Sequence, residues 1–349
     1  MIKAGIIGAT GYAGVELVRI LLKHSEVEKL FLSSVSFEGK NITEVYPNLI
    51  GQLAGKTDGL LINADKVLEA SDVVFAALPN GLAEPYALYC EEHGKKFVDL
   101  SADFRFGDDE DTYVEYYKKN WEHKELHEKA VYGLPEMNRD KIRGASIIGN
   151  PGCYVTASTL AILPALKADI AETSLIIVDA KSGVTGAGRN PTMTNQFCEC
   201  GESFSAYKVG AHRHQPEIAR NCREFSGKET GIIFTPHLIP QNRGILSTVY
   251  IPLKKAMTTA EIHKIYEDFY EAEHFVRVLP EGTSPTTRSV RYTNYCDIQV
   301  YAVNGGKTLE VVSVIDNMVK GSAGQAVQNM NLMCGFAETE GIDFVPTAF

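Results

Sequence analysis

The stretch Ile6-Ile7-Gly8-Ala9-Thr10-Gly11-Tyr12-Ala13-Gly14 joins an apolar run at the start of the chain to a helical pattern. Its glycines follow the spacing G-x-x-G-x-x-G, between a predicted strand at residues 2–7 and a predicted helix at residues 12–23. A glycine turn lets the backbone approach a pyrophosphate, and the start of the helix offers free N–H groups and the positive end of a dipole. The alternative is a tight turn without a ligand, but the position between strand and helix favours binding. The predicted dinucleotide contacts are Gly8, Thr10, Gly11, Tyr12, Ala13 and Gly14.

The rest of the first 150 residues alternates short apolar runs with helical patterns. Because strand and helix follow each other repeatedly, this pattern predicts a parallel sheet with right-handed crossovers. Further strands are predicted at residues 29–34, 72–77 and 96–100, and further helices at residues 66–70 and 82–93.

Residues 151–321 have more strands and fewer helices between them, which predicts an α+β domain with a largely antiparallel sheet. Asn304-Gly305-Gly306, between two apolar alternating runs, is a strong signal for a hairpin turn. We therefore predict an α/β protein with a Rossmann-type dinucleotide-binding domain at residues 1–150 and a second, catalytic domain at residues 151–321. A predicted helix at residues 323–334 would return the chain to the first domain, which then includes residues from about 322 to 349. The strands predicted in the second domain are residues 175–180, 231–235, 245–252, 275–279, 297–303 and 309–316, and its helices are residues 215–224 and 259–273.

The choice of dinucleotide depends on the end of the second predicted strand. A site for NAD usually has Asp or Glu there, which accepts hydrogen bonds from the ribose 2′-hydroxyl. Here the strand ends Leu32-Ser33-Ser34, and the next acid is Glu38. Because hydroxyls donate to a 2′-phosphate without repelling it, Ser33 and Ser34 favour NADP as the cofactor. Pro79, after a later strand, is expected to line the same site, with a plain turn as the alternative.

The composition limits the class of protein. The chain has 349 residues, 44% apolar and 22% charged, which is typical of a globular protein of two domains. Its formal net charge of −10 argues against a nucleic-acid partner, which needs a concentrated basic face. We read no signal peptide and no membrane span, and seven scattered cysteines indicate reduced thiols in the cytoplasm. Cys198 and Cys200 form a C-x-C pair without a second pair at zinc spacing, so no metal is predicted.

Cys153 is the candidate nucleophile. It lies in Gly149-Asn150-Pro151-Gly152-Cys153-Tyr154, between a short apolar strand and a helical pattern at residues 155–167. Unpaired N–H groups at a helix N-terminus stabilise a thiolate over a thiol, which makes the cysteine more reactive. A cysteine is more often a small buried apolar residue, but the turn before Cys153 favours an exposed sulfur.

The segment Gly210-Ala211-His212-Arg213-His214-Gln215-Pro216 supplies the proton-transfer partner that a thiolate nucleophile needs. We expect Gln215 to be the N-cap of the following helix and Pro216 its first residue. An extended backbone before that helix would put His212 and His214 on one side, where either could act as acid and base. Cysteine with histidine also fits a hydrolase. A hydrolase leaves the glycine stretch unexplained, whereas hydride transfer to an acyl-thioenzyme explains both features.

Several further segments stand beside the glycine stretch at residues 8–14 and the segment at residues 149–154. They are Asp99-Leu100-Ser101-Ala102-Asp103-Phe104-Arg105, Tyr132-Gly133-Leu134-Pro135-Glu136, Ser182-Gly183-Val184-Thr185-Gly186-Ala187-Gly188-Arg189, His212-Arg213-His214-Gln215-Pro216-Glu217-Ile218, His237-Leu238-Ile239-Pro240, Arg243-Gly244-Ile245 and Asp316-Asn317-Met318-Val319-Lys320-Gly321. With these segments the chain resembles the N-acetyl-γ-glutamyl-phosphate reductases of arginine biosynthesis and, more distantly, the aspartate-semialdehyde dehydrogenases. The resemblance runs in order over nearly the whole length, and the departure noted is Gln215, where that family more often has Thr or Ser.

The resemblance implies a reaction. Cys153 would attack the acyl carbon of N-acetyl-L-glutamyl 5-phosphate and expel phosphate. NADPH would then reduce the thioester, releasing N-acetyl-L-glutamate 5-semialdehyde. His214, or alternatively His212, would relay the protons.

The resemblance also implies binding residues. Arg105 would hold the leaving phosphate, with a surface ion pair as the alternative reading. Arg189 and Arg243 would hold a carboxylate or a cofactor phosphate. Further cofactor contacts would come from Ser182, Gly183 and Asn317.

Three other interpretations remain open. The enzyme could be an aspartate-semialdehyde dehydrogenase, or an N-acetyl-aminoadipyl-phosphate reductase of lysine synthesis, because fold and thioester would be the same. A nucleotide sensor without activity is the third, although a sensor has no need for an activated thiol. The second domain's sheet could pair across a two-fold axis, so we expect a homodimer or a homotetramer that acts on a small molecule.

Overall fold

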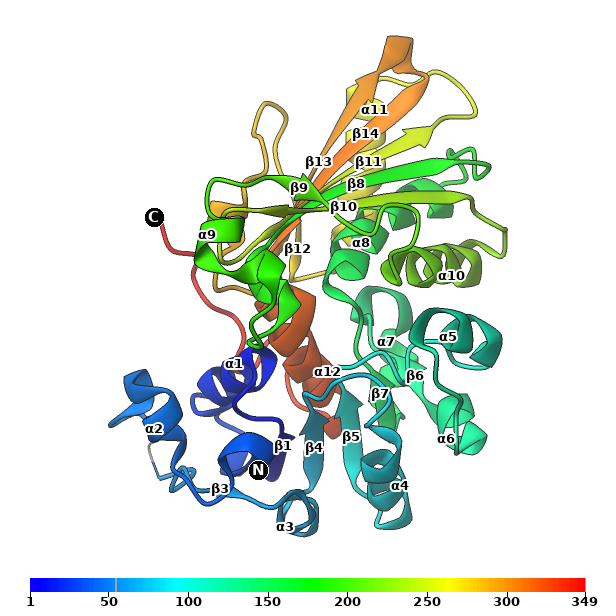
Figure 1. Ribbon diagram of the computed structural model, residues 1–349. Coiled ribbons are helices and arrows are strands. Elements are labelled where there is room, and N and C mark those ends of the chain that lie inside the picture. Colours follow the sequence, from blue (N-terminus) through cyan, green and yellow to red (C-terminus); the bar gives the residue numbers. More distant parts are fainter. Residues whose placement is uncertain (54, 349) are drawn as a thin grey trace. The chain divides into compact units, whose positions relative to one another are not determined.

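The computed structural model describes residues 1–53 and 55–348, so the last residue of the predicted return to the first domain lies outside it. The chain forms two compact units (Figure 1). Unit 1 comprises Met1–Pro151 and Ser322–Asp343, and unit 2 comprises Gly152–Gly321 and the residues after Asp343. Within the described residues, no helix is both long enough and apolar enough to cross a membrane.

Unit 1 contains a sheet of seven described strands, in the order β3-β2-β1-β4-β5-β7-β6. All of its paired strands run parallel, as the alternation of strand and helix predicts. β4 is buried along its whole length, which fits a central strand covered on both faces. The strands are β1 (Ile2–Ile7), β2 (Val27–Ser33), β3 (Leu61–Ile62), β4 (Val73–Ala76), β5 (Lys96–Asp99), β6 (Val131–Tyr132) and β7 (Ile147–Gly149).

The last helix of unit 1 comes from the far end of the sequence. α12 (Gly324–Cys334) packs on α1, α7 and β5, and its first ten residues are buried. Its polar side chains complete the local hydrogen bonding, because Asn329 donates to the carbonyl oxygen of Gly133 at 2.8 Å. The other helices of unit 1 are α1 (Tyr12–Leu21), α2 (Ile42–Val45), α3 (Ala64–Ala70), α4 (Glu84–Glu92), α5 (Glu110–Tyr117), α6 (Lys124–Lys129) and α7 (Pro135–Arg143).

Unit 2 contains a second sheet, in the order β12-β13-β14-β11-β8-β10-β9 among the described strands. Most pairs are antiparallel, whereas β10 pairs with β8 and β12 with β13 in parallel. The predicted combination of a parallel sheet and a largely antiparallel one is therefore confirmed. The strands are β8 (Ile176–Gly183), β9 (Ser205–Ala206), β10 (Ile232–Ile239), β11 (Ile245–Pro252), β12 (Val276–Val278), β13 (Cys296–Val303) and β14 (Thr308–Ile315).

One face of this second sheet forms the core of unit 2. Strand register places Phe234, Val178, Val249, Val311 and Val300 in a row across five neighbouring strands, and all five are buried. Side chains alternate between faces along a strand, so this row lies on one face. The helices α8 (Cys153–Lys167), α10 (His214–Ser226) and α11 (Thr259–Tyr270) pack in this unit, and α8 contacts β8, β11 and β14.

Candidate active site

The three glycines after β1 serve three different steric purposes. Gly8 has φ +90°, and an added Cβ there would lie 2.3 Å from the carbonyl oxygen of Ala77. A Cβ on Gly14 would lie 2.1 Å from the carbonyl oxygen of Gly8, so this glycine allows α1 to pack against the turn. Gly11, the N-cap of α1, gives no side-chain cap, and a Cβ added to it would lie 3.5 Å from the carbonyl oxygen of Gly8, an ordinary contact distance. The backbone N–H groups at the start of α1 are therefore accessible to an anion, as a dinucleotide pyrophosphate requires.

The end of β2 is tied to the glycine turn. The carbonyl oxygen of Ser33 accepts hydrogen bonds from the N–H groups of Gly8 and Ala9, at 3.1 and 2.8 Å. The hydroxyls of Ser34 and Thr10 are 2.7 Å apart, and both serines are less than 5% exposed. Ser33 and Ser34 thus lie beside the turn, and the Ser34 hydroxyl contacts that of Thr10.

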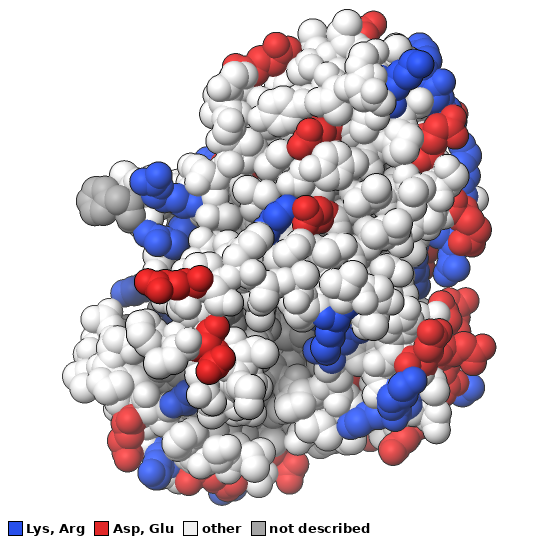
Figure 2. Space-filling model, turned by 45° about the horizontal axis from the view of Figure 1, so that its top comes forward, with Lys and Arg blue, Asp and Glu red and all other residues white. Residues whose placement is uncertain are grey.

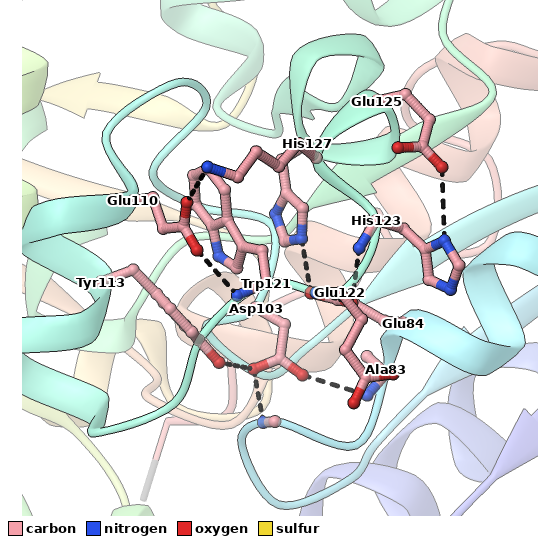
Figure 3. A network of polar contacts seen from close by, with 12 residues as sticks. Ala83, Glu84, Asp103, Glu110, Tyr113, Trp121, Glu122, His123, Glu125 and His127 are labelled. Atoms are coloured by element: carbon pink, nitrogen blue, oxygen red, sulfur yellow. Dashed lines mark hydrogen bonds and ion pairs between the residues drawn. The ribbon is translucent and has the colours of Figure 1, made fainter.

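The loop between β4 and α4 is held by a buried carboxylate that we did not assign from the sequence. Asp103 is 1% exposed and accepts hydrogen bonds from the N–H groups of Gly81, Leu82 and Ala83, at 2.6 to 3.0 Å. Figure 3 shows it between this backbone and Tyr113, whose hydroxyl donates at 2.8 Å. The exposed Pro79 lies in this fixed loop.

A second carboxylate secures the start of α4 in the same network (Figure 3). Glu84 accepts hydrogen bonds from Nε2 of His127 at 2.7 Å and from two backbone N–H groups, which lower the pKa of Glu84 despite its burial. His127 is fully buried and stacks on Trp121, with ring centroids 3.9 Å apart. Residues 81–84 are therefore fixed by Asp103 and by the hydrogen bonds of Glu84.

Arg105 is buried rather than part of a surface ion pair. It is 7% exposed, and it donates to the carbonyl oxygens of Asn150 at 2.7 Å and Leu100 at 3.1 Å. The fully buried Asp99 has its pKa raised by burial and by the charge of Asp103, an effect that the Arg105 guanidinium partly opposes. The guanidinium is thus held in place within unit 1. Its contact residue Asn150 comes three positions before Cys153 in the sequence.

Cys153 is the first residue of α8, which agrees with its predicted place at a helix N-terminus. The N-cap is Gly152, whose lack of a side chain leaves the first turn without a side-chain cap. The N–H groups of that turn therefore remain able to stabilise a thiolate or an oxyanion. Gly321 packs against Cys153, because a Cβ added to Gly321 would lie 2.9 Å from Cβ of Cys153.

The two histidines lie together, but the helix begins earlier than predicted. α10 starts at His214 with Arg213 as N-cap, so the expectation of Gln215 as N-cap and Pro216 as first residue is wrong. The backbone turns instead of extending, and the N–H of His214 donates to Nδ1 of His212 at 3.1 Å. The ring centroids are 4.7 Å apart. The histidines are neighbours because of a turn and not because of strand alternation.

The surroundings of the two histidines differ. A Cβ on Gly152 would lie 2.5 Å from Nε2 of His214, so this imidazole lies against the residue that precedes Cys153. His212 is 7% exposed, and burial, with the charges of Arg213 and Lys208, lowers its pKa to about 3. His212 is therefore uncharged at neutral pH.

Sequence reasoning missed three residues around the thiol. Glu217, fully buried on α10, accepts a hydrogen bond from the N–H of Gly152 at 3.0 Å. The hydroxyl of Tyr207 donates to that of Tyr154 at 3.3 Å, which in turn donates to the carbonyl oxygen of His237. Burial raises the pKa of Tyr207 to about 12, and the nearby Cys153 adds to the effect. Glu217 stood in a quoted motif, but nothing in the sequence marked Tyr207.

The predicted glycine-rich loop after β8 meets two other predicted residues. Asn317 is 1% exposed, accepts from the N–H of Gly244 at 2.8 Å and donates to Thr185 at 3.0 Å. Arg243 pairs with the fully buried Asp316 at 3.4 Å.

Ser182 and Gly183, at the end of β8, are buried, and the Ser182 hydroxyl donates to the carbonyl oxygen of Gly183 at 2.9 Å. Arg189 is exposed beyond η3 (Val184–Ala187).

The described residues form neither a one-sign surface on the face drawn in Figure 2 nor a cluster of metal ligands. Basic and acidic side chains are interspersed on the face drawn in Figure 2, and large parts of it carry neither. In residues 1–53 and 55–348, no group of three or more His, Cys, Asp or Glu side chains could hold a metal ion.

Two family descriptions match most of the chain. The semialdehyde dehydrogenase NAD binding domain matches residues 3–145, and the semialdehyde dehydrogenase dimerisation domain matches residues 153–317. The chain thus has the domains of a semialdehyde dehydrogenase, an oxidoreductase class that uses a nicotinamide cofactor.

Curated relatives narrow this class. N-acetyl-gamma-glutamyl-phosphate reductase of Clostridium botulinum strain Eklund 17B is 46% identical over 349 residues, with 100% of both chains covered. The enzyme of the same name from Moorella thermoacetica is 48% identical, with 98% of both chains covered. The chain belongs to the N-acetyl-γ-glutamyl-phosphate reductase family, as the sequence motifs indicate.

Solved structures share the fold at low sequence identity. Aspartate semialdehyde dehydrogenase II of Vibrio cholerae, complexed with ASA, has a TM-score of 0.73 at 17% identity and covers 96% of this chain and 98% of its own. The Candida albicans aspartate semialdehyde dehydrogenase with NADP has a TM-score of 0.69 at 14% identity, over 96% of this chain and 98% of its own.

Proposed function

We propose that this enzyme reduces N-acetyl-L-glutamyl 5-phosphate to N-acetyl-L-glutamate 5-semialdehyde with release of phosphate, as a step of arginine biosynthesis. The observation that carries the proposal is Cys153 at the uncapped start of α8, with the His214 imidazole against Gly152. Reductases of this name, 46 to 48% identical over almost the full length, support the substrate.

In this mechanism the Cys153 thiolate attacks the acyl carbon, and the bond from that carbon to the phosphate oxygen breaks. The N–H groups in the first turn of α8 stabilise the oxyanion that forms at the acyl oxygen. The product of this step is a thioester on Cys153 and free phosphate. When bound, the nicotinamide cofactor supplies the hydride that reduces the thioester carbon. The carbon–sulfur bond then breaks, which releases the aldehyde and regenerates the thiolate.

His214 is the proposed acid and base. It takes the thiol proton before attack and protonates or deprotonates the oxygen as the thiohemiacetal forms and collapses. His212 is uncharged at neutral pH because burial lowers its pKa to about 3, so it is poorly suited to deliver a proton. Its Nδ1 accepts the N–H of His214 and thereby orients the start of α10. We therefore assign His212 a positioning role and keep His214 as the proton carrier.

The binding residues follow the same proposal. The buried Arg105 guanidinium, held by the carbonyl oxygens of Asn150 and Leu100, is the proposed binding group for the departing phosphate, because a guanidinium can make paired contacts to phosphate oxygens. The finer choice of cofactor is NADP, because β2 ends at serines and not at an acid that would repel a 2′-phosphate. Either hydroxyl can be the donor between Ser34 and Thr10, so Ser34 can accept from Thr10 and donate to the phosphate at the same time. The other cofactor contacts proposed from the sequence remain as stated, and Arg189 and Arg243 remain candidates for anionic groups.

The test of the function is turnover in the reverse direction, measured as phosphate-dependent reduction of NADP and, separately, NAD. We expect N-acetylglutamate 5-semialdehyde to be preferred over aspartate semialdehyde and over the homologue with one more methylene. Cys153→Ser should lower turnover by about 10³-fold or more, because the nucleophile is lost. NADP binding, followed by titration, should stay unchanged.

The matched control is Cys198→Ser, which changes an exposed cysteine in the same unit. It should keep both turnover and binding. Turnover retained in Cys153→Ser would rule out the thioester, and a preference for aspartate semialdehyde would favour the alternative dehydrogenase.

Assembly and location are part of the proposal. The match to a dimerisation domain supports an oligomer, which we propose to be a homodimer or a homotetramer. The cysteines of the described residues are all free thiols, which supports a cytoplasmic enzyme.

A further inference from the structure

A cavity of about 200 Å³ in unit 2 is lined by three arginines, of which the proposed reaction assigns only one. One wall is the loop after β10, from Gln241 to Arg243. The other wall includes Thr287 and Arg288 of η5 (Thr287–Val290) and the two residues that follow it, Arg291 and Tyr292.

The arginines leave this cavity positively charged. Arg243 pairs with the fully buried Asp316. In residues 1–53 and 55–348, neither Arg288 nor Arg291 has an acidic partner within salt-bridge distance. Two guanidinium charges are therefore uncompensated, although the chain as a whole has a net charge of −10. Guanidinium groups that converge on one concave site favour an anion there.

Tyr292 holds the arginines in place at a conformational cost. Its φ is +65°, in the left-handed region that bulky side chains rarely adopt, and its N–H donates to Asp316 at 2.7 Å. Its ring centroid lies 4.9 Å from the guanidinium carbon of Arg243 and 5.4 Å from that of Arg291. Strain of this kind persists where the surroundings fix it, and here it places one ring against two cations.

A buried N–H donor of Arg291 also lacks a partner within the part of the chain that the structure describes. Nε of Arg291 is buried and has no hydrogen-bond acceptor among the described residues. A buried N–H without an acceptor is destabilising, so native proteins rarely keep one without a ligand or an ordered water. An oxyanion in the cavity would supply the missing acceptor.

We propose that Arg288 and Arg291 bind a small oxyanion, a carboxylate or a phosphate, in this cavity, which Tyr292 and Arg243 also line. A chain of contacts connects this cavity with the thiol. Arg243 pairs with Asp316, the N–H of Gly321 donates to the carbonyl oxygen of Asp316 at 3.0 Å, and Gly321 lies against Cys153. The choice among reactants rests on the proposed function, whose substrate carries a carboxylate and a phosphate and whose cofactor carries a 2′-phosphate. Anion binding itself does not depend on it.

The direct test is calorimetric titration of the full-length protein with inorganic phosphate and, separately, with N-acetylglutamate. We expect the protein to bind at least one of these anions. Arg288→Gln together with Arg291→Gln should weaken that binding by about tenfold or more, because two charge-assisted contacts are lost. Arg291→Lys should keep only part of the anion binding of the native protein, since an ammonium cannot make the paired contact of a guanidinium. If neither anion binds the native protein, or the double variant binds as well as the native protein, the proposal is wrong.

Two further variants protect this test. Arg288→Gln alone changes an exposed side chain, so it reports on binding even if the double variant folds poorly. Arg223→Gln, at an exposed arginine on α10 that pairs with Glu229, is the matched control and should leave binding unchanged.

Steady-state kinetics then identifies the source of the anion. A higher KM for the semialdehyde, for phosphate or for NADP in Arg288→Gln assigns the cavity to the substrate carboxylate, the phosphate or the cofactor, respectively. Weaker titration with all three KM values unchanged assigns it to an anion outside the reaction. The titrations need no turnover. Inactivity toward N-acetylglutamyl substrates would therefore overturn the proposed function, but the measured anion binding would remain valid.

Discussion

At the scale of single residues, the proposed site depends on two glycines that cannot be replaced without moving a reactive group. Gly152 makes room for the His214 imidazole, and Gly321 makes room for Cβ of Cys153. Neither has a positive φ among the described residues, so the requirement is space and not backbone conformation. Glycine here sets the positions of the thiol and the imidazole.

Gly152→Ala tests this requirement. The new Cβ would meet the end of the His214 side chain, which can rotate away at little cost in stability. We expect kcat to fall by about 10²-fold, because small displacements of a catalytic group have effects of this size. The melting temperature should change little. Gly144→Ala is the control, since the nearest atom to its added Cβ is 3.9 Å away and its φ is −96°. Full activity in Gly152→Ala would contradict the role given to His214.

His212 gives a prediction about stability and pH. Burial lowers its pKa to about 3, so below pH 6.5 the unfolded chain binds a proton that the folded chain does not. The contribution of His212 is therefore fully present above about pH 6.5 and is lost as the pH falls toward 3. From about pH 7.5 to 5 the expected loss in free energy of unfolding is about 2 kcal/mol.

Urea unfolding at the two pH values, followed through unit 2, measures this loss. His212→Asn should remove about 2 kcal/mol of the pH dependence, whereas His93→Asn, at an exposed position, should keep it. An unchanged pH dependence in His212→Asn would show that another group titrates.

At the scale of elements, the sequence was most informative where periodicity and turn residues agree. β1 and β11 have the predicted bounds, and the hairpin at Asn304–Gly306 adopts three consecutive positive φ angles, for which two glycines and an asparagine are well suited. Short elements such as α2 and β9 were missed, because four residues or fewer carry no readable period.

The site was predicted unevenly for a related reason. Motifs mark residues near each other in the chain, so Cys153 and the histidines could be found. Tyr207 and Asp103 reach their partners through tertiary packing, and Tyr207 lies 53 residues from the tyrosine it contacts. The error at the start of α10 arose because Pro216 was taken for the first helical residue, whereas it is the third. Proline is tolerated throughout the first turn, where N–H groups have no helical partner.

The uncovered face of the second sheet supports a prediction about assembly. Register places Ile233, Ile177, Tyr250, Glu310 and Tyr301 in one row on the face opposite the core row. Ile233 is 48% and Ile177 37% exposed, so apolar surface on this face faces solvent in the single chain. An apolar sheet face within a region that matches a dimerisation domain favours burial against a second copy.

Ile233→Glu should shift the protein from its oligomer toward the monomer, because the interface would bury an unpaired charge. Light scattering after gel filtration gives the molar mass over a range of concentrations. Ile50→Glu changes a similarly exposed isoleucine in unit 1 and should leave the mass unchanged. An oligomer that withstands Ile233→Glu would place the interface elsewhere.

At the scale of the whole molecule, the two units divide the chemistry. Unit 1 has the glycine turn, the β2 serines and Arg105, and unit 2 has the thiol, the histidines and the arginine cavity. The overall negative charge gives no hint of that cavity. Composition averages over the chain, whereas anion binding depends on a few guanidinium groups without partners.

The late return of α12 to unit 1 has a consequence for synthesis. Unit 2 is almost a continuous segment, while unit 1 is interrupted and needs residues 322–343 to fill the place beside α1, α7 and β5. During translation, all strands of unit 1 are made before residue 150, and all strands of unit 2 follow. α12, which completes unit 1, is made only after them. Until α12 (residues 324–334) is made, the surface of α1, α7 and β5 that it covers stays exposed, and exposed apolar surface of this kind favours aggregation of the nascent chain.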